Sequence, residues 1–173
     1  MTSMNPLSQG RMLARYKAWS SRMIFDAAAK LPEGEVTKPR QSVFKSIAHM
    51  LNHIYVIDRV FQAHLEGRPH GYTARNTPGS PPLEELRRVQ LDMDAWYVSF
   101  SDALTPATAA EKVSFEYIGG GQGLMTRAEI LLHVVNHGTY HRGFVADFFY
   151  QIPVQPPATD LTVYLRDVPQ AAA

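Results

Sequence analysis

Apolar residues recur every three or four positions along four long stretches of the chain, which is the spacing of amphipathic helices. This pattern predicts helices at residues 7–31, 42–66, 82–103 and 127–151. Proline or glycine follows each stretch, as is typical of helix ends, at Pro32, Gly67, Pro106 and Pro153. The hydrophobic pattern therefore predicts an all-α protein whose long helices each bury one face.

The segment between the third and fourth predicted helices has a different pattern. Apolar and polar residues alternate from Lys112, and a glycine-rich run follows at residues 119–123. Alternation followed by a glycine cluster predicts a short β-hairpin within residues 112–125. The run lacks the Lys-Ser/Thr ending of a phosphate-binding loop, so that function is not favoured. Thr126 and Glu129 have the spacing of a capping box, which marks the start of the fourth helix.

Together these elements predict a four-helix bundle with a small β-hairpin between helices three and four. We expect one domain spanning residues 1–173, since a chain of this length can form one hydrophobic core. Asp58 lies beside the apolar stripe of the second helix, where it can pair with a neighbouring helix. The tail contains Leu161 and Tyr164, which we expect to pack on the bundle or on a partner.

Composition excludes several classes of function. The net charge is +1, so the sequence gives no reason to expect a nucleic-acid or anionic-membrane partner. The chain has no cysteine, which excludes disulfides, thiolate metal ligands and a thiol nucleophile from the protein itself. The first residues lack a signal-peptide pattern, and no apolar run reaches about 18 residues. We therefore expect a cytoplasmic protein that does not enter a membrane.

Histidine is the residue type that suggests a chemical role. His133, His137 and His141 are spaced four apart in the fourth predicted helix, so they share one side of it. At about 100° per residue, the apolar face is centred roughly 50° from His137 and includes His141, whereas His133 lies farther out. Burying an imidazole costs free energy unless it is paired or coordinated, so a metal ion is one explanation. His64, near the end of the second helix, and His70, in the loop that follows it, are expected to be solvated.

The second predicted helix supplies a third inward histidine. His53 lies at the edge of the apolar stripe, roughly 80° from its centre, whereas His49 lies roughly 120° away and is expected to be more exposed. If the second and fourth helices are neighbours, His53 can meet His137 and His141 in one site. Three histidines with open coordination positions are typical of catalytic metal sites. Ligands without thiolates favour zinc, nickel or iron over copper(I). The alternative is that the histidines lie at the surface without a metal.

Several segments of the chain resemble the DinB family, also described as DinB/YfiT-like metalloenzymes. They are residues 16–19 with 31–32, 44–59, 132–143 and 156–166. The resemblance implies an up-down-down-up four-helix bundle, often a homodimer, with a metal held by one histidine of helix two and a His-x3-His pair of helix four. On this sequence the implied ligands are His53, His137 and His141. Relatives often have His and Gln where this chain has Tyr140 and Phe144, which affects the expected pocket lining and not the ligands.

The resemblance implies a metal-dependent enzyme and leaves the reaction open. Relatives include thiol-dependent transferases and isomerases and others described as hydrolases; the family's DNA-damage-inducible label describes expression and not chemistry. We expect one divalent ion per chain, zinc or nickel first and iron or manganese as alternatives. The ion would activate water or a low-molecular-weight thiol. The thiol would be a cosubstrate, because the chain has no cysteine. No catalytic residue is assigned, since Glu129 lies about eight residues before His137.

Two alternatives to an enzyme remain open. The first is a non-catalytic, stress-related helical bundle that binds a metal or a small molecule. The second is a structural dimer in which the histidines are incidental. Metal content separates the second alternative from the other hypotheses, and a screen of thiols against electrophiles separates an enzyme from a binding protein.

Overall fold

The computed structural model describes residues 6–169, which are mostly helical with one small antiparallel hairpin. The helices are α1 (Pro6–Ala28), α2 (Ile47–Leu65), α3 (Leu83–Ala103), α4 (Pro106–Ala109), α5 (Arg127–Tyr150) and α6 (Leu161–Asp167). The strands are β1 (Lys112–Glu116) and β2 (Gln122–Thr126). The four predicted helices and the predicted hairpin are therefore present, whereas the short helices α4 and α6 were not predicted.

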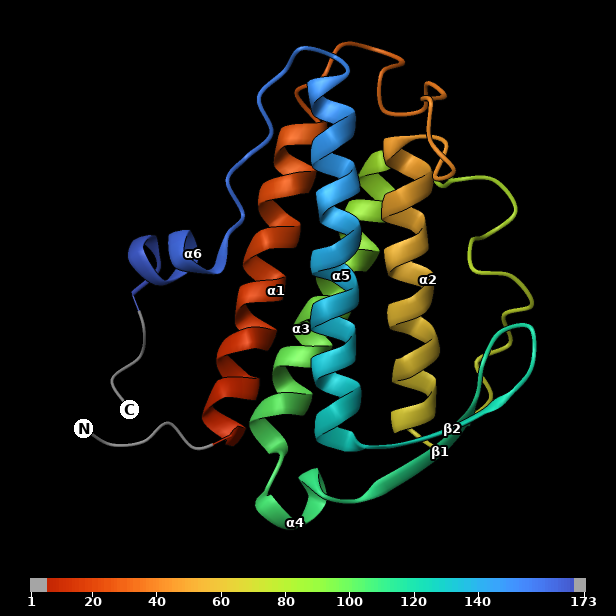
Figure 1. The fold of residues 1–173 in the computed structure, drawn as a ribbon, viewed down its shortest axis with the longest axis vertical. Helices are drawn as coiled ribbons and strands as arrows, with labels where there is room; N and C mark the ends of the chain where they lie inside the picture. Colours follow the sequence, from red (N-terminus) through yellow and green to blue (C-terminus); the bar gives the residue numbers. More distant parts are fainter. Residues whose placement is uncertain (1–5, 170–173) are drawn as a thin grey trace.

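The four long helices lie side by side (Figure 1). Helix α1 packs against α3 and α5, and α2 packs against the same two helices. In Figure 1, α1 and α5 run upward, whereas α2 and α3 run downward. The long connection at the right of the view carries the chain from the end of α2 back to the start of α3. The two helices that carry the inward histidines, α2 and α5, are thus neighbours, which is the condition for a shared site.

The start of α2 differs from the prediction. The helix begins at Ile47 and not at Ser42. Lys45 has a φ of +62°, which a right-handed helix does not allow, so the helical pattern cannot extend back through it. Ser46 then acts as the N-cap, and its hydroxyl accepts the backbone N–H of His49 at 3.2 Å. Helix α1 also ends about one turn earlier than predicted.

Capping boxes begin two of the helices. The box predicted for α5 is confirmed, because Thr126 Oγ1 accepts the N–H of Glu129 and Glu129 Oε2 accepts the N–H of Thr126 at 2.7 Å. Thr105 and Thr108 form a similar box at the start of α4, with Pro106 at its first position. The sequence indicated only the end of the preceding helix at Thr105 and Pro106, so α4 was missed.

The hairpin closes through a run of glycines. Strand β1 pairs with β2 in antiparallel register, from Lys112 opposite Thr126 to Glu116 opposite Gln122. The three consecutive glycines at 119–121 have φ of +93°, +97° and +96°. Glycine adopts this region without the steric cost that a Cβ imposes, so the glycine run is a structural requirement of the turn. The hairpin lies at one end of the long helices, where β1 contacts α2 and β2 contacts α5 (Figure 1).

The C-terminal tail folds back onto α1 and α5. Tyr164 of α6 is buried against Tyr16 and Val135. The Tyr16 hydroxyl donates a hydrogen bond of 2.7 Å to the carbonyl of Thr159, just before α6. The predicted packing of the tail on the helices is therefore confirmed.

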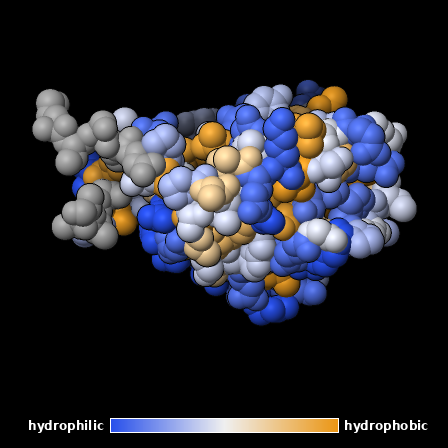
Figure 2. Space-filling model, turned by 90° about the horizontal axis from the view of Figure 1, so that it is seen from below, coloured by the Kyte–Doolittle hydropathy of each residue, from blue (hydrophilic) through white to orange (hydrophobic). Residues whose placement is uncertain are grey.

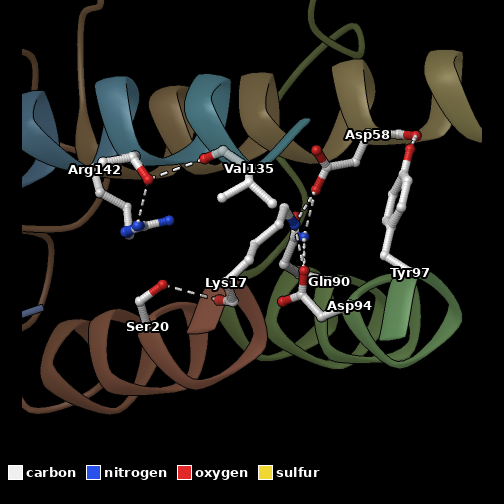
Figure 3. Close-up of polar contacts among 9 residues, drawn as sticks. Lys17, Ser20, Asp58, Gln90, Asp94, Tyr97, Val135 and Arg142 are labelled. Carbon is white, nitrogen blue, oxygen red and sulfur yellow. Dashed lines mark hydrogen bonds and ion pairs between the residues drawn. The ribbon is translucent and has the colours of Figure 1, made fainter. Parts of the chain in front are cut away.

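A buried ionic cluster joins α1, α2 and α3 (Figure 3). Lys17 of α1 forms ion pairs with Asp58 of α2, at 2.6 Å, and with Asp94 of α3. Gln90 donates to both carboxylates, at 2.8 and 3.1 Å, and the Tyr97 hydroxyl donates to the carbonyl of Asp58 at 2.7 Å. All five side chains are at most 1% exposed. The expectation that Asp58 pairs with a neighbouring helix is thus confirmed.

The surface at the hairpin end mixes apolar and polar residues. Viewed from that end, hydrophobic residues form separate patches between hydrophilic ones (Figure 2). Tyr117, in the turn of the hairpin, is 51% exposed, and Leu124, in β2, is 60% exposed. Within residues 6–169, no helix is long and apolar enough to cross a lipid bilayer.

Candidate metal centre

Helices α2 and α5 bring three histidines together. One ring nitrogen from each of His53, His137 and His141 lies within 4.8 Å of the others, a grouping that can hold a metal ion. The Nε2 atoms of His53 and His137 are 3.2 Å apart. The His141 ring centroid lies 4.6 Å from that of His53 and 4.4 Å from that of His137. Within residues 6–169, no other group of three His or carboxylate side chains converges in this way.

The burial of the three rings follows the angular order expected from the sequence. His141 is only 6% exposed, whereas His53 and His137 are half-buried. The buried Nδ1 atoms of His137 and His141 have no hydrogen-bond partner among the described residues. Because unpaired buried imidazoles cost free energy, a coordinated ion would compensate for part of this cost. The donor set and its convergence therefore fit a divalent metal ion.

A backbone carbonyl sets the tautomer of His53. Its Nδ1 lies 2.9 Å from the carbonyl oxygen of Arg75. A carbonyl oxygen only accepts, so the proton of neutral His53 is on Nδ1, and Nε2 presents its lone pair toward His137. Metal-binding histidines are commonly oriented by such a hydrogen bond on the other ring nitrogen. This role of Arg75 could not be predicted from the sequence, because the contact depends on the path of the loop.

The loop that contains Arg75 forms further hydrogen bonds with α2. Asn76 Nδ2 donates to the carbonyl of His49 at 2.7 Å. The backbone N–H of Thr77 donates to Asn52 Oδ1 at 2.9 Å, and Asn52 is fully buried. These contacts fix the position of the Arg75 carbonyl relative to the histidine cluster.

All three histidines are held in the neutral form. Burial lowers the pKa of His137 to about 2, and repulsion from the charged forms of His141 and His53 adds to the effect. Burial also lowers the pKa of His141 to about 4. The pKa of His53 is lowered by burial as well, although its hydrogen bond to the Arg75 carbonyl opposes the shift. At neutral pH each imidazole therefore keeps one ring proton and offers one lone pair, which is the state that binds a metal.

The other histidines of α2 and α5 lie outside the cluster. His133 packs against Phe61, with ring centroids 4.5 Å apart, and its ring is 5.8 Å from that of His137. His49 is half-buried and lines the same pocket without joining the group. Among the histidines of the cluster and these two, only His141 is buried, whereas His49, His53, His133 and His137 are all half-buried. The convergence of ring nitrogens, and not burial, therefore separates the cluster from His49 and His133.

The expectation for the remaining two histidines was wrong. His64 and His70 were expected to be solvated, but both are half-buried and their ring centroids are 5.4 Å apart. Phe115 of β1 packs on His64 at 5.2 Å and on Phe61 at 5.4 Å. The hairpin therefore covers this part of α2, a long-range contact that the local sequence does not reveal.

The three histidines line a pocket of about 480 Å³. It is lined by Val43, Phe44, His49, His53, Ile57, Phe61, Arg75, Asn76, Tyr117, His133, His137 and His141. No aspartate or glutamate among the described residues lines it. Glu129 is engaged in the capping box, which agrees with leaving it without a catalytic role. The pocket thus combines aromatic walls and imidazoles with no carboxylate that could act as a general base.

Tyr140 and Phe144 surround the site without lining the pocket. The Tyr140 ring lies 4.9 Å from that of His141 and is 60% exposed. Phe144 packs on Phe44 at 4.4 Å, and Phe44 lines the pocket. The two departures from the family pattern therefore act on the pocket indirectly, through their contacts with lining residues.

The fold and the sequence both match known proteins. A model of the DinB family matches residues 2–170. Protein DinB of Bacillus subtilis (strain 168) is 28% identical over 161 residues, which cover 88% of this chain and 91% of the relative. The crystal structure of a DinB-like protein from Bacillus cereus has a TM-score of 0.64 and 16% identity, and the match covers 83% of this chain and 91% of that chain. At that identity the likeness supports the fold alone. Because the family model spans nearly the whole sequence, the chain belongs to the DinB family.

Proposed function

We propose that His53, His137 and His141 bind one divalent metal ion and that the protein is a metal-dependent enzyme acting on small molecules. The observation that carries this proposal is the convergence of three ring nitrogens within 4.8 Å at the wall of a pocket of about 480 Å³. Three protein ligands leave coordination positions open, which is the arrangement of catalytic sites. Zinc and nickel are the metals that this all-imidazole set favours, with iron or manganese as alternatives.

A metal bound at this site would lower the pKa of a bound water or thiol and so supply a nucleophile at neutral pH. The residues of the chain perform the supporting roles. His137 and His141 project from successive turns of α5, and His53 meets them from α2 with its tautomer set by the Arg75 carbonyl. Phe44, Phe61 and Tyr117 would pack against an apolar part of the substrate. The reaction class that follows is hydrolysis or thiol transfer. In thiol transfer the thiol would be a cosubstrate, because the chain has no cysteine.

A second candidate function is a non-catalytic protein that binds a metal or a small molecule. The observation that favours it is the absence of any aspartate or glutamate among the described residues that line the pocket. Without a carboxylate base, proton transfer would depend on a histidine outside the cluster or on solvent.

Two measurements distinguish these functions. Protein purified without a histidine tag should contain about one zinc or nickel per chain, and its absence would leave the histidines incidental. A screen of low-molecular-weight thiols and hydrolysable esters should then give turnover that stops when a chelator removes the metal. Stoichiometric metal with no turnover in either assay would favour the binding protein.

We also propose the family's up-down-down-up four-helix bundle and its homodimer for this chain. The directions of α1, α2, α3 and α5 in Figure 1 and their pairwise packing support the bundle. The dimer is supported by the resemblance to the family, which includes homodimers.

A further inference from the structure

Arg75 differs from the rest of the pocket in its charge. It is the one lysine or arginine among the described residues that line the pocket of about 480 Å³, and no carboxylate lines the pocket with it. The Arg75 side chain is exposed, and it forms no hydrogen bond or ion pair with the described residues. The hydrogen bond from His53 to its carbonyl, 2.9 Å long, fixes the position of this residue beside the histidine cluster. A guanidinium fork is therefore available at the opening of the pocket.

The core beneath the histidines does not cancel this charge. The core contains two buried cations, Lys17 and Arg142, and two buried carboxylates, Asp58 and Asp94, all of them at most 5% exposed (Figure 3). Their formal charges sum to zero. Among the described residues that line the pocket, Arg75 alone carries a permanent charge, and a bound divalent ion would add to this positive charge. A cleft with one sign of charge concentrates ligands of the opposite sign.

The residues that line the pocket indicate which kind of ligand body fits beside Arg75. Phe44 and Phe61 contribute aromatic rings from the side of the helices, and Tyr117 contributes one from the hairpin. The volume of about 480 Å³ is within the range of small-molecule sites. Aromatic and aliphatic walls favour a ligand with an apolar, preferably flat, body.

We propose that the pocket takes a small organic anion with an apolar body, and that Arg75 determines this specificity by pairing with its carboxylate. Arginine binds a carboxylate through two parallel hydrogen bonds, which neither lysine nor a neutral side chain reproduces. The inference rests on the proposed function only for the metal-dependent reaction, which would take place at the end of the ligand that faces the three histidines, away from its carboxylate. The preference for an anion is a property of Arg75 and exists without a metal.

Benzoate and benzamide test this inference, because they have nearly the same shape and differ in charge. Binding is measured by calorimetry or NMR titration on the metal-free protein and on the zinc-loaded protein. The metal-free wild type should bind benzoate roughly tenfold more tightly than benzamide, and the preference should shrink as salt is added. Arg75→Gln should abolish the preference and Arg75→Lys should keep part of it. Arg68→Gln is the control, since Arg68 lies in the same loop, pairs with Glu66 and does not line the pocket.

Arg75→Gln should leave zinc affinity, measured by chelator competition, within about twofold of wild type, because the substitution keeps the backbone carbonyl that orients His53. Equal affinity of the wild type for the two probes would overturn the proposal. So would a preference that survives Arg75→Gln, or one that Arg68→Gln removes equally. A wild-type protein without metal would contradict the proposed function instead, and the comparison in metal-free protein would still decide the role of Arg75.

Discussion

At the scale of single residues, the site depends on where each histidine carries its proton. His53 has its proton fixed on Nδ1 by the Arg75 carbonyl, 2.9 Å away. His137 and His141 are kept neutral by burial, which lowers the pKa to about 2 and about 4. Neutral imidazoles with available lone pairs are what a metal requires, and the fold provides them before any metal binds.

The lowered pKa of His141 should be measurable as a change of stability with pH. In the unfolded chain His141 titrates near 6.5, whereas in the folded protein it titrates near 4. The stability from its neutral form is therefore complete above pH 6.5 and is lost as the pH falls toward 4. Relative to His141→Phe, metal-free wild type should lose at most about 1.4 kcal/mol of unfolding free energy per pH unit in this window. Urea titrations from pH 8 to pH 4 measure the difference.

The comparison with His141→Phe removes the contribution of Asp58. Burial raises the pKa of Asp58 to about 6, so the folded protein binds a proton there more readily than the unfolded chain, and this stability is lost as the pH rises toward 6. Both proteins share this effect, so it cancels. A difference in unfolding free energy that stays constant between pH 8 and pH 4 would show that His141 is not held neutral by the fold.

At the scale of the elements, three of the four long helices are joined by one buried ionic cluster. Lys17 of α1 forms ion pairs with both Asp58 of α2 and Asp94 of α3. Burial by itself would lower the pKa of Lys17, but the two carboxylates raise it, so the ammonium stays charged. The cluster fixes α2 relative to α1 and α3, and α2 carries His53.

Removing the shared cation should be far more costly than breaking a surface pair on the same helix. Lys17→Met leaves two buried carboxylates without their cation and should reduce the unfolding free energy by about 3–5 kcal/mol. Arg15→Ala breaks the pair with Asp102, whose two side chains are 46% and 42% exposed, and should cost less than about 1 kcal/mol. Chemical denaturation of both variants measures the two costs. Similar losses in the two variants would mean that the cluster does not hold the helices together.

The glycines of the hairpin and of α5 should respond oppositely to the same substitution. Gly120 has a φ of +97°, so Gly120→Ala should destabilise the protein by about 1 kcal/mol. Gly143 lies within α5 with open space around its Cα, so Gly143→Ala should stabilise by up to about 1 kcal/mol. Thermal unfolding of the two variants tests the turn geometry. A stabilising Gly120→Ala would contradict it.

At the scale of the whole molecule, the site exists because two helices far apart in the sequence become neighbours. His53 and His137 are separated by 84 positions, and their Nε2 atoms lie 3.2 Å apart. Helical periodicity predicted the face that each histidine occupies, and the meeting was expected on the condition that the two helices are neighbours, which they are. Loop paths have no such periodicity, so neither the contact of the Arg75 carbonyl with His53 nor that of Phe115 with His64 could be predicted from the sequence.

Errors at element boundaries have a similar physical cause. The apolar pattern continued smoothly through the start of α2, so it could not reveal the left-handed backbone of Lys45, with φ of +62°. Helix α6 was missed because it has only seven residues, too few for its apolar positions around Tyr164 to show a helical period. The apolar tail was nevertheless expected to pack on the bundle or on a partner, and Tyr164 packs on Tyr16 of the bundle.

Association is also a property of the whole molecule. We expect a homodimer at micromolar concentration, as proposed above from the resemblance of this chain to the DinB family. Light scattering coupled to size-exclusion chromatography gives the mass directly. The mass of one chain, 19.4 kDa, would count against a dimer, and about twice that mass would support it.

The central claim is that His53, His137 and His141 bind one metal ion. The most direct test measures metal by plasma emission in five single alanine variants, purified without a histidine tag. His137→Ala and His141→Ala should abolish stoichiometric metal and His53→Ala should weaken it severely, because each removes a ligand. His49→Ala and His133→Ala should retain most of it, since both line the pocket outside the cluster. Loss of metal in His49→Ala together with retention in His53→Ala would contradict the assigned site.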